Sequence, residues 1–188
     1  MATSPSRFFT HDRLDLVVKV RFFEALARRR PPRDHGEMYA KHILARTRGV
    51  EPGNPAKANV DGYVKAARDL LRNMTENGFD SRKPIRIDQW GRLRDGAHRI
   101  ACATVLGLNV ELSCVTAPYP IRQWGIDWFR SNGFTRDYVK GLLDHLNLIT
   151  GYSNPAGGVP PPSSPDLQAP SSIRRTRSLP LVGRWKTG

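Results

Sequence analysis

The chain has 188 residues, 39% of them hydrophobic, which suits one ordinary core with additional segments. Its 30 Lys and Arg residues outnumber 17 Asp and Glu residues, which gives a formal net charge of +13. This charge predicts a polyanionic partner, either nucleic acid or an acidic membrane surface; a basic protein that is merely soluble is the alternative. Neither a bilayer-spanning apolar run nor a signal peptide is found, so we expect a soluble, non-secreted protein.

The N-terminal part of the chain predicts a helical segment, residues 1–58, that packs on the rest of the core. Apolar residues between 14 and 26 recur at helical spacing and predict an amphipathic helix. The helix ends in three arginines before a pair of prolines. These arginines are candidate DNA-backbone contacts, and equally the ordinary basic end of a helix: Arg28, Arg29 and Arg30.

Two further helices are predicted before the central motif. Asp34, followed by Glu37 three residues later, is typical of a helix start and predicts a helix through Arg48. The apolar residues from 60 to 74 form the clearest helical stripe in the chain, and Gly78 supplies its stop. We interpret this stripe as core and not as a site.

The most informative segment runs from residue 84 to residue 99. It predicts a short strand, a turn over residues 88–91, a second short strand, and a tight Asp95-Gly96 turn that opens a helix. The helix should close near Gly107, before a strand over residues 110–115.

This geometry predicts an anion site at the start of the helix. A helix N-terminus presents unpaired backbone N–H groups and the positive end of the helix dipole. Gly96 lets the backbone approach a ligand closely, and His98 and Arg99 add donors in the first turn. We expect the Arg99 guanidinium to face solvent, so that it contributes phosphate affinity and little to the core.

The segment also resembles the ParB/sulfiredoxin family, whose members bind nucleotides through a Gly-x-(His/Arg)-Arg helix start after a strand-turn-strand unit. The resemblance covers about residues 60 to 115 and lies in Asp95-Gly96-Ala97-His98-Arg99, followed by Ala101 and Ala103. Branches of this family are nucleotide-dependent DNA-partition proteins, nucleases, a free-serine kinase and sulfiredoxin.

The chain differs from two of these branches at residues that belong to their signatures. Sulfiredoxin has a catalytic Cys at the position of Ala97, so sulfur chemistry is not expected here. Partition proteins have a further Arg at the position of Ala101, and 188 residues leave no room for their helix-turn-helix and dimerisation regions. The kinase branch shares Asp-Gly-x-His-Arg and stays open.

The resemblance implies an α+β fold: a single ParB/sulfiredoxin-like domain, with a small mixed sheet, flanking helices and a disordered C-terminal tail. Residues 59–150 would form the nucleotide-binding core, which includes a helical hairpin over residues 121–149. The second hairpin helix has few basic residues, so we do not expect it to read bases in a major groove.

The implied ligands are ATP or another nucleoside triphosphate, and Mg²⁺. Catalysis is expected from three residues: Arg99 would neutralise growing phosphate charge, Asp95 would hold Mg²⁺ or orient a water, and His98 could act as general acid. Asp95 could equally cap the helix. The expected nucleotide-binding residues are Arg94, Gly96, Ala97, His98 and Arg99.

A small basic chain without the partition protein's appendages also resembles plasmid fertility-inhibition factors. Such factors block DNA transfer through a type IV secretion apparatus and are associated with ATPase and DNase activity. The implied partners are DNA, nucleotide and the coupling components of the secretion system, in the bacterial cytoplasm or at the inner membrane surface.

Two alternatives remain: a non-catalytic, nucleotide-responsive DNA-binding protein, and a serine-type amino-acid kinase. The kinase needs an acidic base, for which the candidates are Glu37, Glu51, Glu76 and Glu111.

From residue 151 to residue 188 the composition changes. Seven prolines, six serines and five glycines in these 38 positions predict a flexible tail, since such a segment cannot bury enough apolar surface. Its basic end suits docking to DNA, acidic lipid or a partner protein, and an inert solubilising tail is the alternative. The candidate DNA contacts are Arg174, Arg175 and Arg177.

Both cysteines lie in apolar patterns and predict buried, free thiols in a reducing compartment. Cys102 falls on the helix of the motif and Cys114 on the strand that follows. We expect Cys114 to pack beneath that helix with Val110 and Leu112, and therefore to be inert.

Overall fold

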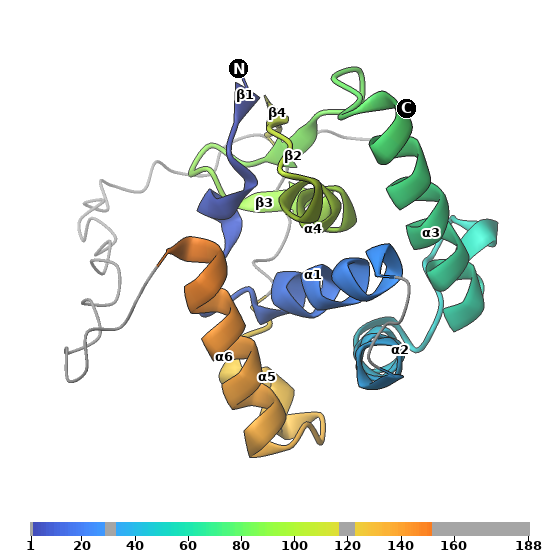
Figure 1. Ribbon diagram of the computed structural model, residues 1–188, viewed down its shortest axis with the longest axis vertical. Coiled ribbons are helices and arrows are strands. Elements are labelled where there is room, and N and C mark those ends of the chain that lie inside the picture. Colours follow the sequence, from blue (N-terminus) through green and yellow to red (C-terminus); the bar gives the residue numbers. More distant parts are fainter. Residues whose placement is uncertain (1, 29–32, 117–122, 152–188) are drawn as a thin grey trace, which may run out of the picture. The chain divides into compact units, whose positions relative to one another are not determined.

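The computed structural model describes residues 2–28, 33–116 and 123–151 (Figure 1). Its elements in chain order are β1 (Ala2–Thr3), η1 (Pro5–Phe8), α1 (Leu14–Ala27), α2 (Arg33–Thr47), η2 (Pro55–Lys57), α3 (Val60–Asn77), β2 (Ile85–Ile87), β3 (Leu93–Asp95), α4 (Ala97–Leu106), β4 (Val110–Cys114), α5 (Ile126–Ser131) and α6 (Arg136–Thr150). The predicted α+β class and small mixed sheet are confirmed. Outside the described residues lie Arg29, Arg30, and the tail beyond Gly151 with Arg174, Arg175 and Arg177.

The sheet has the strand order β1-β4-β2-β3. Strand β2 pairs antiparallel with β3 and parallel with β4, so the helix α4 connects β3 to a strand on the far side of β2. Strand β1 adds an antiparallel edge to β4. This two-residue strand was not predicted, because so short a segment has no periodicity to detect.

The strand-turn-strand-helix unit of the motif is confirmed. Gly96 precedes α4 in the left-handed region, with φ of 101°, and a Cβ atom there would lie 2.6 Å from Ile85 Cδ1. Both the backbone conformation and the packing therefore require glycine at the junction. Helix α4 closes at Gly107, also left-handed with φ of 67°.

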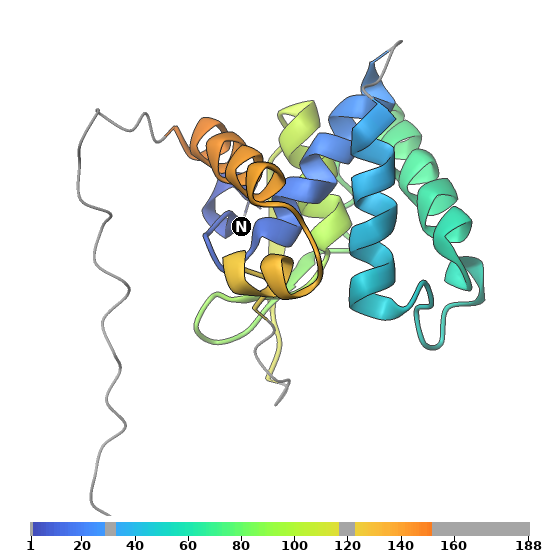
Figure 2. The same cartoon turned by 90° about the horizontal axis from the view of Figure 1, so that it is seen from below.

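Helix α1 occupies the centre of the core, and the prediction that it is amphipathic is wrong. Ten of its fourteen residues are buried. Helices α2, α3, α4 and α6 all contact it, and Figures 1 and 2 show it crossing the middle of the helical part of the fold. The spacing of Leu14, Val17 and Phe22 marked one apolar face, whereas Leu16, Val20 and Phe23 are buried as well.

The remaining helices follow the sequence pattern closely. Helix α2 begins at Arg33, so Asp34 lies inside its first turn and does not cap it. Helix α3 stops at Gly78, with φ of 73°, as predicted. Short α5 and longer α6 form the helical hairpin, and the Thr135 side chain accepts the Tyr138 N–H at 3.2 Å to cap α6.

The predicted burial of Cys114 is wrong. Burial along β4 falls from Val110, which is fully buried, to Cys114, which is exposed, because the strand leaves the core at its carboxyl end. Cys102 on α4 is buried, as expected.

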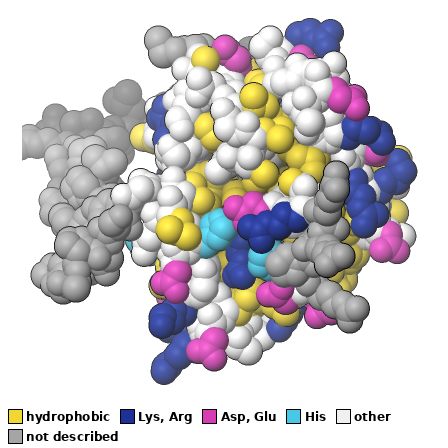
Figure 3. All heavy atoms as spheres, in the orientation of Figure 1, with side chains coloured by type: hydrophobic (Ala, Val, Ile, Leu, Met, Phe, Trp, Pro, Cys, Tyr) yellow, Lys and Arg dark blue, Asp and Glu magenta, His cyan; other side chains and the backbone are white. Residues whose placement is uncertain are grey.

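On the face shown in Figure 3, the described Lys and Arg side chains are scattered among acidic and apolar ones and form no continuous basic stripe. No helix in residues 2–28, 33–116 and 123–151 has both the length and the apolar character needed to cross a membrane.

Candidate functional site

A pocket of about 600 Å³ lies at the start of α4. Its walls come from segments that are far apart in the sequence: the start of α1, the end of α2, the loop through η2, helix α3, the β3–α4 junction and Trp124. The five predicted nucleotide-binding residues, Arg94, Gly96, Ala97, His98 and Arg99, all line this pocket.

The pocket is strongly cationic. Five lining residues are basic, namely Arg13, Arg46, Lys57, Arg94 and Arg99, and two are acidic, Glu51 and Asp95. Lys57 and Glu51 form an ion pair at 2.6 Å. Arg99 pairs with Asp95, and Arg13 and Arg94 pair with the buried Asp15 and Asp88, which do not line the pocket. Basic residues still outnumber acidic ones in the lining beside the N-terminal end of α4, and this arrangement favours an anionic ligand.

Arg99 is tied into the fold, contrary to the expectation that it faces solvent. Its side chain is 21% exposed. The guanidinium donates to the backbone carbonyls of Lys83 and Pro84, and its Nη2 lies 3.1 Å from Asp95 Oδ2. Arg99 thus fastens the segment that enters β2 to the first turn of α4 while it lines the pocket.

Asp95 ends β3 and does not cap α4. The N-cap position is Gly96, which makes no side-chain cap hydrogen bond, and the Asp95 carboxylate pairs with Arg99 instead. Its side chain is 63% exposed. Asp95 is the single acid at the junction, and the described residues include no group of three Asp, Glu, His or Cys side chains that could hold a metal.

Asp95 is the predicted protein ligand for Mg²⁺. This ion is held by one or two carboxylates together with water and substrate phosphates. One ion-paired carboxylate does not make a preformed magnesium site, so the assignment of Asp95 as a magnesium ligand stays a prediction.

His98 lines the pocket and is half-buried. Its Nε2 and the Tyr39 hydroxyl share a hydrogen bond of 2.7 Å, and the Tyr39 ring stacks on Phe22 with 3.9 Å between centroids. Burial, reinforced by the charges of Lys19 and Arg46, holds the pKa of His98 well below its usual range. A neutral imidazole has no proton to deliver readily at neutral pH, which argues against the general-acid role.

Arg94 is shared between the pocket and the β2–β3 turn. Its Nη2 donates to Asp88 Oδ2 at 2.6 Å, and its side chain is 10% exposed. Arg92 Nε donates to the same oxygen at 2.8 Å. The buried Asp88 carboxylate therefore orients the pocket-lining Arg94 and shapes the turn.

A buried ionic cluster lies next to the pocket. Arg13, which lines it, donates from Nε to Asp15 Oδ1 at 2.8 Å, and Lys19 Nζ donates to Asp15 Oδ2 at 2.8 Å. Asp15 and Lys19 are both fully buried. Burial lowers the pKa of Lys19 to about 7, although the Asp15 carboxylate acts to raise it.

Part of the pocket lining was not predicted from the sequence. Trp124 is flanked by two guanidinium groups, with its ring centroid 5.3 Å from Arg13 Cζ and 5.4 Å from Arg46 Cζ. The buried Tyr63 hydroxyl and the buried Arg46 Nε have no hydrogen-bond partner in the described chain. None of these residues belongs to a motif, and only the tertiary fold brings them to the motif.

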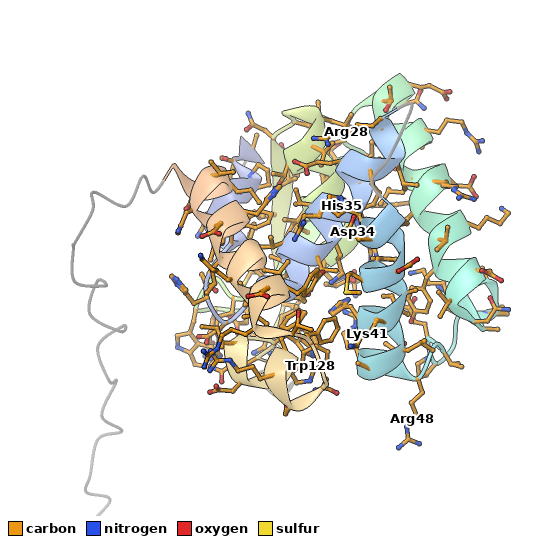
Figure 4. All side chains as sticks on the ribbon, turned by 60° about the horizontal axis from the view of Figure 1, so that its bottom comes forward. Arg28, Asp34, His35, Lys41, Arg48 and Trp128 are labelled. Carbon is orange, nitrogen blue, oxygen red and sulfur yellow. The ribbon has the colours of Figure 1, made fainter. Side chains whose placement is uncertain are left out.

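Of the predicted DNA contacts, the structure describes only Arg28, which is exposed and does not line the pocket. Figure 4 shows Arg28 at the end of α1, near Asp34 and His35 at the start of α2, while Arg48 extends outward from the far end of α2.

No protein-family model, curated protein or solved structure matches this chain.

Proposed function

We propose that the protein binds a nucleoside triphosphate in the pocket at the start of α4 and hydrolyses it. The observation that carries the proposal is the coincidence of the anion-binding start of α4 with five basic side chains in one pocket of about 600 Å³. Phosphate groups would accept hydrogen bonds from the first backbone N–H groups of α4, and the surrounding cations would offset their charge.

The residues of this site would have distinct roles. Arg99 and Arg94, whose guanidinium groups are held by fixed partners, would stabilise charge that develops on the transferred phosphate. His98 would act as a neutral hydrogen-bonding group oriented by Tyr39. Mg²⁺ that arrives with the nucleotide would add charge neutralisation, with Asp95 as its predicted protein ligand.

A negative charge at Ala97, a half-buried residue at the edge of the core, tests the proposal. Ala97 is the first residue of α4 and lines the pocket. In the Ala97→Asp variant, the positive end of the helix dipole would stabilise the new carboxylate, and the carboxylate would repel phosphate. We expect at least about tenfold weaker binding of ATP or CTP, equivalent to about 1.4 kcal/mol, and loss of hydrolysis.

Ala97→Ser is the matched control, because it changes size and polarity at the same position without adding charge. It should retain nucleotide affinity. Equal affinity of the Ala97→Asp variant and the unaltered protein, measured by calorimetry, would place nucleotide binding outside this pocket.

One observation favours a second candidate, the serine-type kinase. Of the four glutamates predicted as candidate bases, Glu51 lines the pocket. Its carboxylate, paired with Lys57 at 2.6 Å, would accept the proton of an acceptor hydroxyl that is bound in the pocket. ATP-dependent phosphorylation of free serine, lost in Glu51→Gln, would favour the kinase over the hydrolase.

The biological role that we propose rests on the resemblance to fertility-inhibition factors: interference with plasmid DNA transfer through a type IV secretion system, from the bacterial cytoplasm or the inner membrane surface. The net charge of +13 supports a DNA partner, and DNase activity is part of the proposal. Transfer frequencies with the unaltered protein and with Ala97→Asp would show whether inhibition requires the nucleotide pocket.

A further inference from the structure

The turn between β2 and β3 presents an aromatic side chain to solvent. Trp90 is 62% exposed, the highest value among the large aromatic residues in the described ranges. The Cζ atom of Arg92 lies 4.4 Å from its ring centroid, so a guanidinium covers one face of the indole. The exposed fraction leaves the rest of the ring available to a partner.

This turn is rigid, and Asp88 is the reason. The Asp88 carboxylate accepts N–H groups from the backbone of Trp90 at 3.0 Å and of Arg92 at 2.9 Å. The Asp88 backbone closes the turn, since its carbonyl accepts from Gly91 N–H at 2.9 Å and its N–H donates to Arg92 O at 3.0 Å. Binding of a partner to Trp90 therefore costs little conformational entropy in this loop.

Two guanidinium groups lie at the turn that presents the ring. Besides Arg92, Arg7 lies close to the turn. Its Nη2 atom would be 3.5 Å from a Cβ atom if Gly91 carried one. Arg7 is exposed and forms no ion pair with any carboxylate in residues 2–28, 33–116 and 123–151. The one acid in the turn, Asp88, is buried and already bound by Arg92 and Arg94.

We propose that Trp90 is a stacking platform for an unpaired base, and that Arg7 and Arg92 bind the adjacent phosphates of a single-stranded nucleic acid. An exposed aromatic ring among cations is the combination that holds single strands without regard to sequence. In a duplex the base faces are already stacked and are not available to the indole.

The composition of the turn disfavours other partners. Gln89 and Gly91 flank Trp90, so the tip has one apolar side chain where membrane insertion needs a larger apolar face. The same isolation leaves no apolar ring of residues to exclude water around a protein–protein anchor. The site is separate from the nucleotide pocket, because Trp90 and Arg7 do not line it.

The test is binding of a labelled oligothymidylate to the full chain, followed by fluorescence anisotropy. Trp90→Ala should weaken binding by about 5- to 150-fold, the range measured for loss of one base-aromatic stack, whereas Trp90→Phe should retain most of the affinity. The matched control is Leu148→Ala, which removes another exposed apolar side chain, 79% exposed, on α6. The Leu148→Ala variant should bind the oligothymidylate with unchanged affinity.

Salt dependence separates the stacking residue from the phosphate-binding residues. Trp90→Ala should leave the slope of log affinity against log salt unchanged, while Arg7→Gln should reduce its magnitude by about 0.7. Binding of a duplex of the same length should not respond to Trp90→Ala. The proposal is overturned if the oligothymidylate does not bind, if Trp90→Ala binds it normally, or if Trp90 is instead required for binding to anionic phosphatidylserine vesicles.

Discussion

Arg99 Nη2 lies 3.1 Å from Asp95 Oδ2 across the β3–α4 junction, and the same guanidinium is bound to the carbonyls of Lys83 and Pro84. One side chain thus connects the approach to β2, the end of β3 and the first turn of α4. Arg99 is therefore a structural residue in addition to a candidate phosphate ligand.

We expect Arg99→Ala to lower the free energy of unfolding by about 2 kcal/mol, because hydrogen bonds to charged groups contribute about 1.5 to 3 kcal/mol. Arg99→Lys keeps the charge but not the fork that reaches three acceptors, so it should be intermediate in stability. Urea denaturation measures both. Wild-type stability in Arg99→Ala would show that these contacts contribute nothing, and its nucleotide affinity could then be interpreted alone.

The buried Asp15 predicts a large loss of stability on neutralisation. Asp15→Asn would remove the carboxylate that pairs with Lys19 and Arg13 in the core, so Lys19 must either lose its proton or stay charged without a partner, and breaking a buried ion pair costs about 3 to 5 kcal/mol. The double variant Asp15→Asn/Lys19→Met should recover much of that loss, since it removes the unpaired amine. Thermal denaturation of the two variants provides the measurement; equal stabilities would contradict this account.

The same residue predicts acid sensitivity. Burial opposes the charge of Asp15, but Lys19 and Arg13 outweigh it and hold the pKa of this carboxyl well below its usual value of 3.8. Its stabilising contribution is complete above pH 3.8 and is lost as the pH falls further, because the unfolded chain then binds a proton that the folded chain does not. In the double variant, unfolding free energy should fall less steeply in this acidic range.

Local structure could be predicted from the sequence, whereas the packing of the helices against one another could not. The strand-turn-strand-helix unit was predictable because Gly96 and the Asp88 turn encode it locally. The burial of Asp15 and Lys19 was not, since a polar pair within an apolar helix has the same spacing as a solvent-facing one. Arg46 and Trp124 come from segments with no common motif, and only packing around α1 brings them to the pocket.

His42 predicts a second pH effect at higher pH. Its ring is buried parallel to Phe129, with 5.8 Å between centroids, and neither ring nitrogen has a hydrogen-bond partner in the described chain. Burial, with the charges of Lys19 and Arg46, holds the pKa of His42 well below 6.5. Below pH 6.5 the unfolded chain takes up a proton that folded His42 does not, so stability falls with the pH.

We expect His42→Phe to reduce the dependence of unfolding free energy on pH by up to about 1.4 kcal/mol per pH unit in this range, the value for one proton. The variant should also be at least as stable as the unaltered protein at neutral pH, since it removes two unpaired buried nitrogen atoms. Denaturation at a series of pH values tests this, and an unchanged dependence would mean that His42 is protonated in the folded protein.

The two thiols should differ sharply in reactivity. Burial raises the pKa of Cys102 to about 12, so it carries almost no thiolate at neutral pH, whereas Cys114 is exposed at the end of β4. One thiol per native chain should therefore react with a disulfide reagent, and a second only in denaturant. Peptide mapping should identify Cys114 as the labelled residue; native labelling of Cys102 would contradict the packing of α4.

The central position of α1 has a consequence for biosynthesis. After this helix has left the ribosome, the chain must lengthen by more than a hundred residues before α6, one of the helices that covers it, has been made. During that interval its apolar faces, including Phe22 and Phe23, have only part of their eventual cover, and such surfaces are prone to aggregation in a nascent chain. Chaperone demand during translation should therefore end only when residue 150 has emerged.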